Sequence, residues 1–456
     1  MFPSSTTTTP VRRSGRRIAA LAAGALLALS AAGCATNGGT DPGAAATTEA
    51  QSADSPITVW VDATRAPAAE AFQKANPDIP IKVETYDGSS GGSNSFKTKM
   101  ALFDQSGSGW PDVVFSSQNN DASWASQSQG GKQAFAADLS SGVVPKETLD
   151  QFTKGSLDVC TVDGKVYCLR NDLAQEVLWY DKSLMDQFGY QVPKTWEEYQ
   201  ALGQKVAKEH PGYIIGGAGD SFDGQIYMWS AKCEAGKLDS ATSISVDVTS
   251  DQCKAAASLL DDGIKNKYLS TVSVFTPEFV QQYSGKVLML PGPAWYGGAL
   301  FNNPESLNIP KGQMGIGDPM AWGSGPAVTG NVGGGTWFVS SHSRNTEAAS
   351  KFVQFVTTDD SYQVDQAPGY PAYAPAAEKW LAKQAASGYY ATSMDALTNA
   401  APLVWSDWSA PSFSQESVWS KTVTPVITSG GSVLDTLPTW QTAIENEAKV
   451  NGYTVK

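Results

Sequence analysis

The pentapeptide Gly88–Gly92, GSSGG, is the first stretch that could carry catalytic chemistry, because it matches the Gly-X-Ser-X-Gly pattern of a nucleophile elbow. Such an elbow needs a helix directly after the serine, whereas here Gly91 and Gly92 keep the chain loose before the next expected helix. Only His210 and His342 could act as a base, and His342 lies in the surface-like segment SHSRN. The pattern therefore favours a loop over a serine hydrolase.

The first 34 residues have the composition of an export signal. Four arginines precede the apolar run Ile18–Leu29, which is followed by the small-residue stretch SAAGC. This run is shorter than the roughly 20 residues of a bilayer-spanning helix, so residues 1–33 are predicted to be a cleaved signal. SAAGC resembles the lipobox of bacterial lipoproteins, which implies that Cys34 is lipidated and becomes the N-terminus. Because Ala31 replaces the usual apolar residue, simple cleavage with a free Cys34 stays an alternative.

The four other cysteines form an even set, as expected for disulfides in an oxidising compartment. Three pairings can be drawn, and we favour the local ones, because VCTVDGKVYCL is typical of a hairpin that turns on Asp163–Gly164. A two-residue turn would leave the cysteines of this hairpin out of register, so we expect a longer loop or a bulge. The predicted disulfides are Cys160–Cys168 and Cys233–Cys253. Neither the thiols nor the two histidines have the spacing of a zinc site, and we expect no metal and no cofactor.

Composition divides the chain into a tether and an acidic body. Residues 34–56 are rich in Ala, Thr, Gly, Asp and Pro, and they predict a disordered tether. Without residues 1–33, which carry four arginines and no acid, the net charge changes from -13 to -17. Such a body repels phosphate backbones, so we expect no nucleic-acid partner. The remaining residues, about 400, exceed what one core usually supports, and we expect two lobes.

Strands and helices alternate through the first part of the body. The strands ITVWV, IPIKVETY and PDVVFSS are separated by the helices PAAEAFQKA and SFKTKMALFDQS. This order predicts an α/β fold with a parallel, doubly wound sheet. Open sheets of this kind bind ligands beyond the carboxyl ends of their strands. The candidate ligand edge therefore comprises Asp62–Arg65, Asp87–Ser90 and Gln118–Asp121.

Later segments complete a recognisable order. QEVLWYDKSL predicts a strand, PKTWEEYQALGQKVAKE a helix opened by Pro193 and capped by Thr195, and GGGTWFVSS with NTEAASKFVQFVTT a strand and an amphipathic helix. Taken in order, the landmarks ITVWVDAT, WPDVVF, VLWYDKSL with PKTWEEY, GKVLMLPGPAW and GGGTWFVSSHSRNTEAASKFVQFV resemble the carbohydrate-binding branch of bacterial extracellular solute-binding proteins, the relatives of maltose-binding protein. The resemblance covers Ile57–Val450.

This resemblance implies two α/β lobes, with two doubly wound sheets joined by hinge crossovers and a cleft between them. A di- or oligosaccharide would bind in the cleft, and hinge closure would present it to the permease subunits of an ATP-binding-cassette importer. Crossings are expected near Arg170, Gly315 and Asp365. The lobes are then residues 57–169 with 316–365 and residues 170–315 with 366–456. The resemblance further implies a monomer without catalytic activity, held outside the cell membrane only by its N-terminal lipid.

A neutral sugar presents hydroxyl groups at its rim and apolar CH faces above and below, so its receptor needs aromatic platforms and polar side chains. Fourteen tryptophans offer such platforms. The resemblance places the carbohydrate-binding candidates on loops of both lobes. In the first lobe they are Asp62, Thr64, Arg65, Gln118, Asn120, Asp121 and Trp124. In the second lobe and the segments beside it they are Asp172, Gln175, Asp220, Phe222, Trp295, Tyr296, Gly335, Trp337, Tyr370, Trp405 and Trp408.

Departures from the family pattern leave alternatives open. Asp181 stands where the family often has Asn, and GPAW is one residue longer than the commoner Gly-any-Trp arrangement, which could shift Trp295 around the pocket. Asp62 and Asp121 could simply cap the helices that follow them, and the aromatic residues could pack in the core. Two other functions fit the composition: a secreted glycosidase, which needs two carboxyl groups across the scissile bond, and a polyamine binder with an acidic, aromatic cleft.

Overall fold

The computed structural model describes residues 55–456 except 87–91, 119, 129–130 and 241. Up to the first crossing, the elements are β1 (Ile57–Val61), α1 (Ala66–Ala75), β2 (Ile81–Thr85), α2 (Gly92–Ser106), β3 (Val113–Ser116), α3 (Asp121–Ala125), η1 (Leu139–Ser141), α4 (Lys146–Leu149), η2 (Asp158–Cys160), β4 (Thr161–Val162), β5 (Lys165–Val166) and β6 (Leu169–Arg170). Among the described residues no helix is both long and apolar enough to span a bilayer.

The middle of the chain contains β7 (Asp172–Leu173), β8 (Glu176–Asp181), α5 (Lys182–Phe188), α6 (Trp196–Glu209), β9 (Gly216–Gly217), α7 (Ser221–Ser230), β10 (Glu234–Ser240), β11 (Ser243–Asp247), α8 (Asp251–Asn266), β12 (Leu269–Ser270), α9 (Pro277–Tyr283), β13 (Met289–Pro293), the π-helix η3 (Gly297–Phe301) and β14 (Met314–Gly317). The last part contains β15 (Thr336–Val339), α10 (Thr346–Thr358), α11 (Asp360–Gln363), β16 (Tyr370–Pro371), α12 (Ala374–Ser387), α13 (Asp395–Ala400), η4 (Ala401–Leu403), η5 (Ser406–Ser409), α14 (Gln415–Thr422), α15 (Thr424–Thr428), α16 (Val433–Val450) and β17 (Thr454–Val455).

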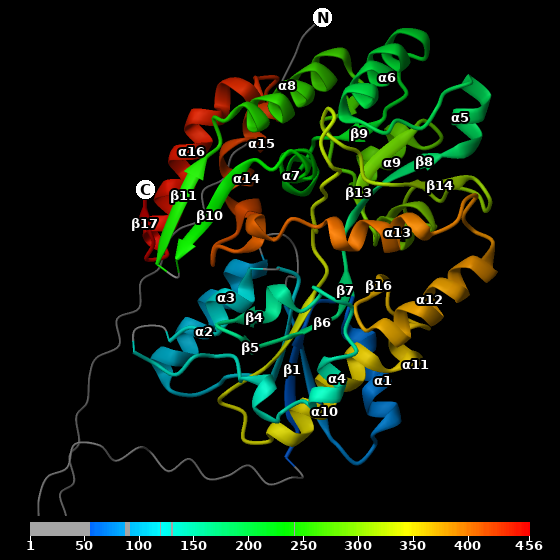
Figure 1. The fold of residues 1–456 in the computed structure, drawn as a ribbon. Coiled ribbons are helices and arrows are strands. Elements are labelled where there is room, and N and C mark those ends of the chain that lie inside the picture. Colours follow the sequence, from blue (N-terminus) through cyan, green and yellow to red (C-terminus); the bar gives the residue numbers. More distant parts are fainter. Residues whose placement is uncertain (1–54, 87–91, 119, 129–130, 241) are drawn as a thin grey trace, which may run out of the picture. The chain divides into compact units, whose positions relative to one another are not determined.

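The first sheet has the strand order β2-β1-β3-β15-β6. Its strands β1, β2 and β3 are parallel, as predicted, whereas β15 runs antiparallel to β3 and to β6. Side chains alternate between the two faces, so Val59 and Phe115 pack toward α1 and α10, and Trp60 and Val114 pack toward α2. Helices therefore cover both faces of this sheet (Figure 1).

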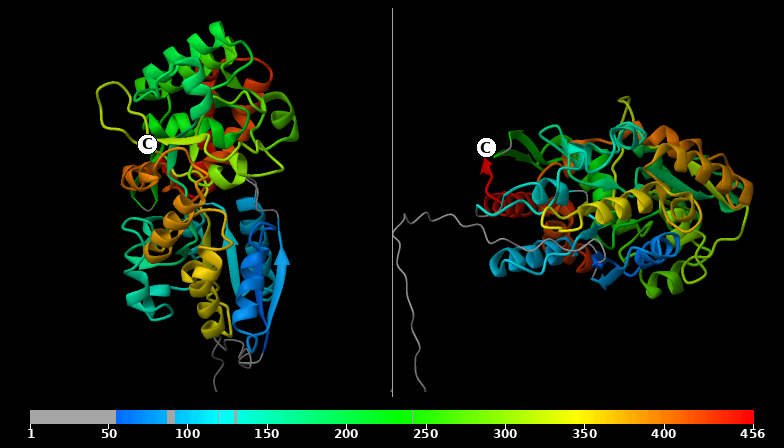
Figure 2. Two further views of the ribbon diagram at one scale, coloured as in Figure 1. Left: turned by 90° about the vertical axis from the view of Figure 1, so that its right-hand side faces the viewer. Right: turned by 90° about the horizontal axis from the view of Figure 1, so that it is seen from below.

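The second lobe contains the antiparallel sheet β13-β8-β14, and the short parallel pair β12-β9 adjoins it through the bridge between Ile214 and Val287. Its hydrophobic core is formed by α6, α7, α8, α14 and α16. Local signals place the helices as predicted: the Thr195 hydroxyl caps α6 by accepting a hydrogen bond from the Glu198 amide at 3.1 Å. Figure 2 shows that each lobe gathers segments that are far apart in the chain.

The chain crosses between the two main sheets at short strands. After β6, strand β7 pairs with β16, and β8 enters the second sheet. These strands lie close in sequence to the crossings expected near Arg170 and Asp365. At the crossing expected near Gly315, by contrast, β14 pairs with β8, and Met320 packs in the core of the second lobe. Strand pairing favours a return at Asn331–Gly335, where Asn331 bridges to Gln175. The lobe boundaries themselves stay a prediction.

Both predicted disulfides are formed in the structure, Cys160–Cys168 and Cys233–Cys253. The expected bulge is absent from the first hairpin: Asp163 and Gly164 both have positive φ, and Val162 pairs directly with Lys165. The two sulfurs still bond because Cys160 lies in the turn η2 and not in a strand, so the register of the strand pairing does not fix its position. The disulfide therefore fixes η2 to the hairpin β4–β5.

Candidate functional site

The first-lobe side of the candidate site lies at the start of α3, directly beyond the carboxyl end of β3. Asn120 is buried there, and the Asp121 carboxylate, which is fully buried, accepts a hydrogen bond from the Ser116 hydroxyl at 2.5 Å. Lys97 from α2 lies 3.4 Å from the other carboxylate oxygen of Asp121 and places its ammonium over Trp124. The predicted ligand edge at Gln118–Asp121 thus contains polar side chains that are held in position by the start of α3.

The second-lobe side is formed by two tryptophans held in fixed orientations. Trp229, in the last turn of α7, and Trp408, in η5, stack with ring centroids 5.7 Å apart and planes 20° apart. The indole nitrogen of Trp229 donates to the Trp405 carbonyl at 2.6 Å, and that of Trp408 donates to the Gln225 amide oxygen at 2.9 Å. These two hydrogen bonds fix the orientation of the rings, which form an apolar wall.

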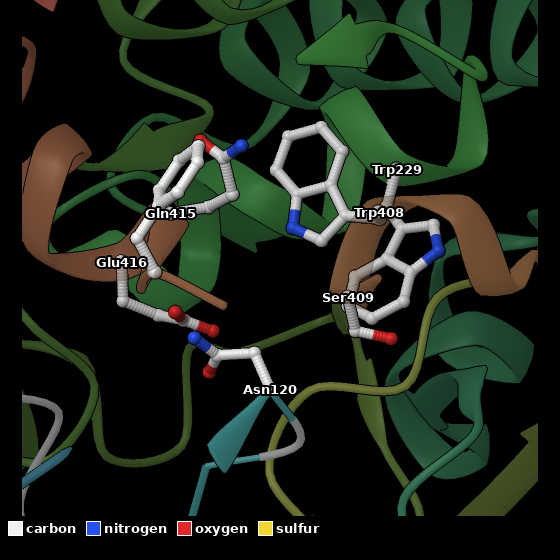
Figure 3. Close-up of a pocket in the computed structure, with 7 residues that line it drawn as sticks. Asn120, Trp229, Trp408, Ser409, Gln415 and Glu416 are labelled. Atoms are coloured by element: carbon white, nitrogen blue, oxygen red, sulfur yellow. The ribbon is translucent and has the colours of Figure 1, made fainter. Parts of the chain in front are cut away.

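A small pocket lies between these two sides (Figure 3). Its lining residues are Asn120, Trp229, Trp408, Ser409, Phe413, Gln415 and Glu416. Its volume of about 10 Å³ admits about one water molecule, so the two sides are nearly in contact. Figure 3 shows the Asn120 amide and the Glu416 carboxylate pointing toward one another across it.

Two buried polar atoms of this pocket have no hydrogen-bond partner among the described residues: the side-chain nitrogen of Asn120 and the side-chain oxygen of Gln415. The nitrogen of Gln415 is used, since it donates to the Ala235 carbonyl at 2.8 Å. A buried donor or acceptor without a partner costs about 1–3 kcal/mol. The pocket therefore presents one donor and one acceptor that a ligand hydroxyl group could satisfy.

The surroundings of the pocket raise the pKa of one carboxyl group, that of Glu416. Burial raises the pKa of Glu416, and the nearby Asp121 carboxylate raises it further, against the hydrogen bond from the Ser414 hydroxyl at 2.8 Å. The ammonium group of Lys97, on the first lobe, partly offsets the negative charge of the Asp121 carboxylate. Its ammonium also donates to the Ser412 carbonyl at 2.6 Å, which links α2 directly to the segment before α14.

A second aromatic group surrounds Trp295. Its ring stacks on Phe275 at a centroid distance of 5.7 Å, and Phe222 meets Phe275 edge-on. The indole nitrogen of Trp295 donates to the Val332 carbonyl at 2.9 Å, beside Gly333, where a Cβ atom would lie 3.2 Å from that nitrogen. Phe275 is 44% exposed, so this group forms a second candidate platform at the crossing.

The crossing itself holds a buried network of charged and amide groups. The Arg170 guanidinium donates to the Gly333 and Asp172 carbonyls at 3.0 and 2.9 Å, and burial lowers its pKa to about 10. Asp172 accepts hydrogen bonds from the Asn171 amide at 2.8 Å and from the Gly335 backbone at 3.1 Å. Such a network orients the strands of the crossing, and it leaves these side chains occupied with one another.

The sequence candidates fall into separate places. Asn120 and Trp408 line the pocket, while Asp121 and Trp405 adjoin it through the contacts above. Asp62, Thr64 and Arg65 lie beyond β1, where the Asp62 carboxylate accepts the Arg65 amide at 2.9 Å and caps the chain entering α1. Asp220 likewise caps α7, near Phe222. Six further candidates are buried and do not line the pocket: Gln118, Asp172, Gln175, Tyr296, Trp337 and Tyr370.

The structure does not bring Trp337 or Gly335 to the pocket. Trp337 is fully buried, packs on Phe115 and Phe352, and donates to the Asn171 amide oxygen at 2.9 Å. A Cβ at Gly335 would lie 2.0 Å from the Phe115 ring, so this glycine is required by core packing. Trp124 meets Phe96 edge-on under Lys97. Cys34 and Asp87–Ser90 lie outside the described residues.

Sequence reasoning missed most of the second-lobe wall. Trp229 follows apolar residues in a helix that is buried almost throughout, and nothing local distinguishes its face from a core face. Gln415 and Glu416 stand in SFSQES, where the only available signal was Ser414, the cap of α14. No group of three or more potential metal ligands occurs among the described residues.

Comparison with known proteins gives a family and a fold. A family model described as bacterial extracellular solute-binding protein matches residues 57–363. The arabinooligosaccharide-binding protein of Halalkalibacterium halodurans is 25% identical over 302 residues, which cover 63% of this chain and 63% of that relative. The match thus leaves more than a third of the relative's length uncovered.

Two solved structures have the same fold. One is the transporter-associated binding protein of B. animalis subsp. lactis in complex with beta-1,6-galactobiose, with a TM-score of 0.72, 20% identity, and coverage of 88% of this chain and 99% of that one. The other is the galacto-N-biose-/lacto-N-biose I-binding protein of Bifidobacterium longum in complex with lacto-N-biose, with a TM-score of 0.72, 19% identity, and coverage of 89% and 100%. At this identity the likeness concerns the two-lobed architecture alone.

Proposed function

This chain belongs to the bacterial extracellular solute-binding proteins, and from that premise we propose that it binds a di- or oligosaccharide between its lobes and delivers it to an ATP-binding-cassette importer. The observation that carries the proposal is the pocket between α3 and α14. There, stacked Trp229 and Trp408 face buried polar groups of which Asn120 has an unused donor.

Carbohydrate chemistry matches both halves of this pocket. The CH face of a sugar ring packs on an indole, which contributes about 0.5–1.5 kcal/mol beyond area burial. Ring hydroxyls both donate and accept, so one hydroxyl can satisfy the Asn120 amide nitrogen and another the Gln415 amide oxygen. The names of the relatives, which include an arabinooligosaccharide-binding protein and complexes with two disaccharides, support the same ligand class.

Binding would be coupled to lobe movement, because the pocket walls come from different lobes. In the described arrangement the pocket has room for about one water molecule, so the lobes must separate to admit a sugar. A ligand that touches both walls then favours the closed arrangement over the open one. The permease subunits would recognise that closed arrangement.

The family is extracellular, and the finer placement is part of the proposal. We place the mature chain on the outer face of the cell membrane, attached through a lipid on Cys34, with residues 34–56 as a tether. It would act as a monomer and without catalysis. Mass spectrometry of the membrane fraction tests the anchor: a diacylglyceryl Cys34 supports it, and an unmodified mature N-terminus contradicts it.

Isothermal titration against a panel of neutral di- and oligosaccharides tests the function. The expected result is binding by at least one sugar, with a loss of about tenfold in Trp408→Ala, since the lost stacking and apolar contact amount to about 1.4 kcal/mol. The matched control is Trp110→Ala, which removes a half-buried tryptophan that stacks on His342 before the start of β3, at the opposite end of that strand from α3, and should leave affinity unchanged.

The same panel addresses the other candidate residues and functions. Trp295→Ala is expected to weaken binding more than tenfold, and unchanged affinity would remove Trp295 from the site. Spermidine serves as the amine arm, and stabilisation by spermidine with no sugar response would refute the carbohydrate proposal. Release of shorter sugars on incubation would instead indicate a glycosidase.

A further inference from the structure

A larger cavity of about 580 Å³ lies beside the small pocket, at the outer end of the contact between the lobes. Its walls come from α3, from the turn η2 with the hairpin β4–β5, from the hairpin β10–β11 and from η5. The lining residues are Ser123, Ser126, Gln127, Asp158, Val159, Thr161, Val162, Asp163, Tyr167, Leu238, Thr242, Ser406, Ser409, Ala410 and Tyr453. We refer to it as the outer groove.

The outer groove continues from the inner pocket. Ser409 lines both cavities, and Trp408 beside it lines the inner one. On the opposite wall α3 spans the same boundary, with Asn120 at the inner pocket and Ser123 at the outer groove. A chain of sugar rings held at the stacked tryptophans can therefore extend along α3 and η5 into the larger space.

The chemistry of the groove suits an uncharged polyol. Its walls carry hydroxyl and amide groups on Ser126, Gln127 and Ser406, and the half-buried ring of Tyr167 offers one aromatic face. Asp158 and Asp163 are its charged residues, and no lysine or arginine occurs among its described lining residues. An anionic sugar would meet these two carboxylates without a compensating cation, so the groove favours neutral ligands.

One wall of the groove is fixed before any ligand arrives. The Cys160–Cys168 disulfide ties η2 to the hairpin, and β4 packs beside α3 (Figure 1). A fixed wall reduces the conformational entropy that binding must remove. The volume of the outer groove, about 580 Å³, also lies within the range of about 300–1,000 Å³ that is typical of ligand sites.

We propose that the outer groove is a second binding site for the distal rings of a neutral oligosaccharide, so that the preferred ligand has three or more sugar units. This inference rests on the proposed function. It assigns the stacked tryptophans to one end of the ligand and Tyr167 with the seryl groups of η5 to the other.

Affinity as a function of chain length tests the proposal. Isothermal titration of the mature protein with dimer-to-tetramer series of galacto-, arabino- and malto-oligosaccharides should show at least tenfold tighter binding of the tetramer than of the dimer in one series. Ser406→Trp fills the groove from an exposed position and should abolish this gain while changing dimer affinity less than twofold. Ala386→Trp on α12, also exposed, is the control that should keep the gain.

Tyr167→Ala is an independent variant, because it removes the aromatic ring that lines the groove. It should weaken tetramer binding by roughly three- to tenfold and leave the dimer unaffected. Equal affinities of dimer and tetramer in the wild type, or a gain that survives Ser406→Trp, would overturn the proposal while the carbohydrate function stands. Binding by no sugar in any series would refute the proposed function and this inference together.

Discussion

The hydrogen bond from Lys97 to the Ser412 carbonyl gives the sharpest test of how the lobes close. Lys97 lies on α2 of the first lobe, and its side chain is only 15% exposed. Its ammonium nitrogen lies 2.6 Å from the carbonyl oxygen of Ser412 in the second lobe. The same nitrogen lies 3.4 Å from a carboxylate oxygen of Asp121 in the first lobe. When the lobes separate, the bond to Ser412 is lost, whereas the contact with Asp121 can persist.

Lys97→Met removes the interaction that distinguishes the two arrangements. A hydrogen bond to a charged group contributes about 1.5–3 kcal/mol, and hydration of the free ammonium in the open arrangement offsets part of it. We therefore take the lower end of this range, which predicts about tenfold weaker sugar binding. Because the variant also uncovers the buried Asp121 carboxylate, the free energy of unfolding should fall as well.

Isothermal titration with the best-binding sugar and urea denaturation of the free protein measure these two effects separately. Lys99→Met is the matched control, since it removes the same charge from an exposed position of the same helix and should change neither quantity. An unchanged sugar affinity in Lys97→Met, in a protein that folds, would show that the bond to Ser412 does not bias closure, and the reasoning would be wrong.

The remaining predictions concern stability. Burial raises the pKa of Glu176 well above 4.5, so wild-type stability should decline as pH rises above that value, and Glu176→Gln should show a smaller decline. An equal loss of unfolding free energy between about pH 5 and about pH 8 in the two proteins, measured by urea denaturation, would contradict this. Cys160→Ser with Cys168→Ser should cost about 2–3 kcal/mol of unfolding free energy, read from urea midpoints, and an unaltered midpoint would mean that the disulfide is dispensable. Gly224→Ala would place a Cβ 2.3 Å from the Trp419 ring, and a loss of about 1–3 kcal/mol is expected by thermal denaturation; a variant as stable as the wild type would refute this packing argument.

Local patterns were sufficient for the parts of the fold that local forces determine. The first strands and helices, the cap at Thr195 and the hairpin turn at Asp163–Gly164 follow from periodicity and turn chemistry, and the structure contains them. The direction of β15 did not follow, because an apolar strand of four residues carries no signal for its neighbours.

The candidate site was predictable from the sequence on its first-lobe side and not on its second-lobe side. Asn120 and Asp121 follow a buried strand, and the carboxyl edge of a sheet is a general location for ligands. Trp229 and Glu416 meet them only through tertiary packing between segments far apart in the chain. Trp337, by contrast, was predicted to line the site and is buried in the core, because an aromatic residue after glycines has the same local pattern in both positions.

The position of β15 between β3 and β6 determines when the first lobe can fold. Trp337 pairs with Phe115 on one side and with Leu169 on the other, so the sheet is incomplete until residue 339 is available. Contacts of such long range form slowly because a large loop must be closed first. A chain that ends before residue 336 therefore lacks the strand that joins β3 to β6, and β6 then has no partner in this sheet.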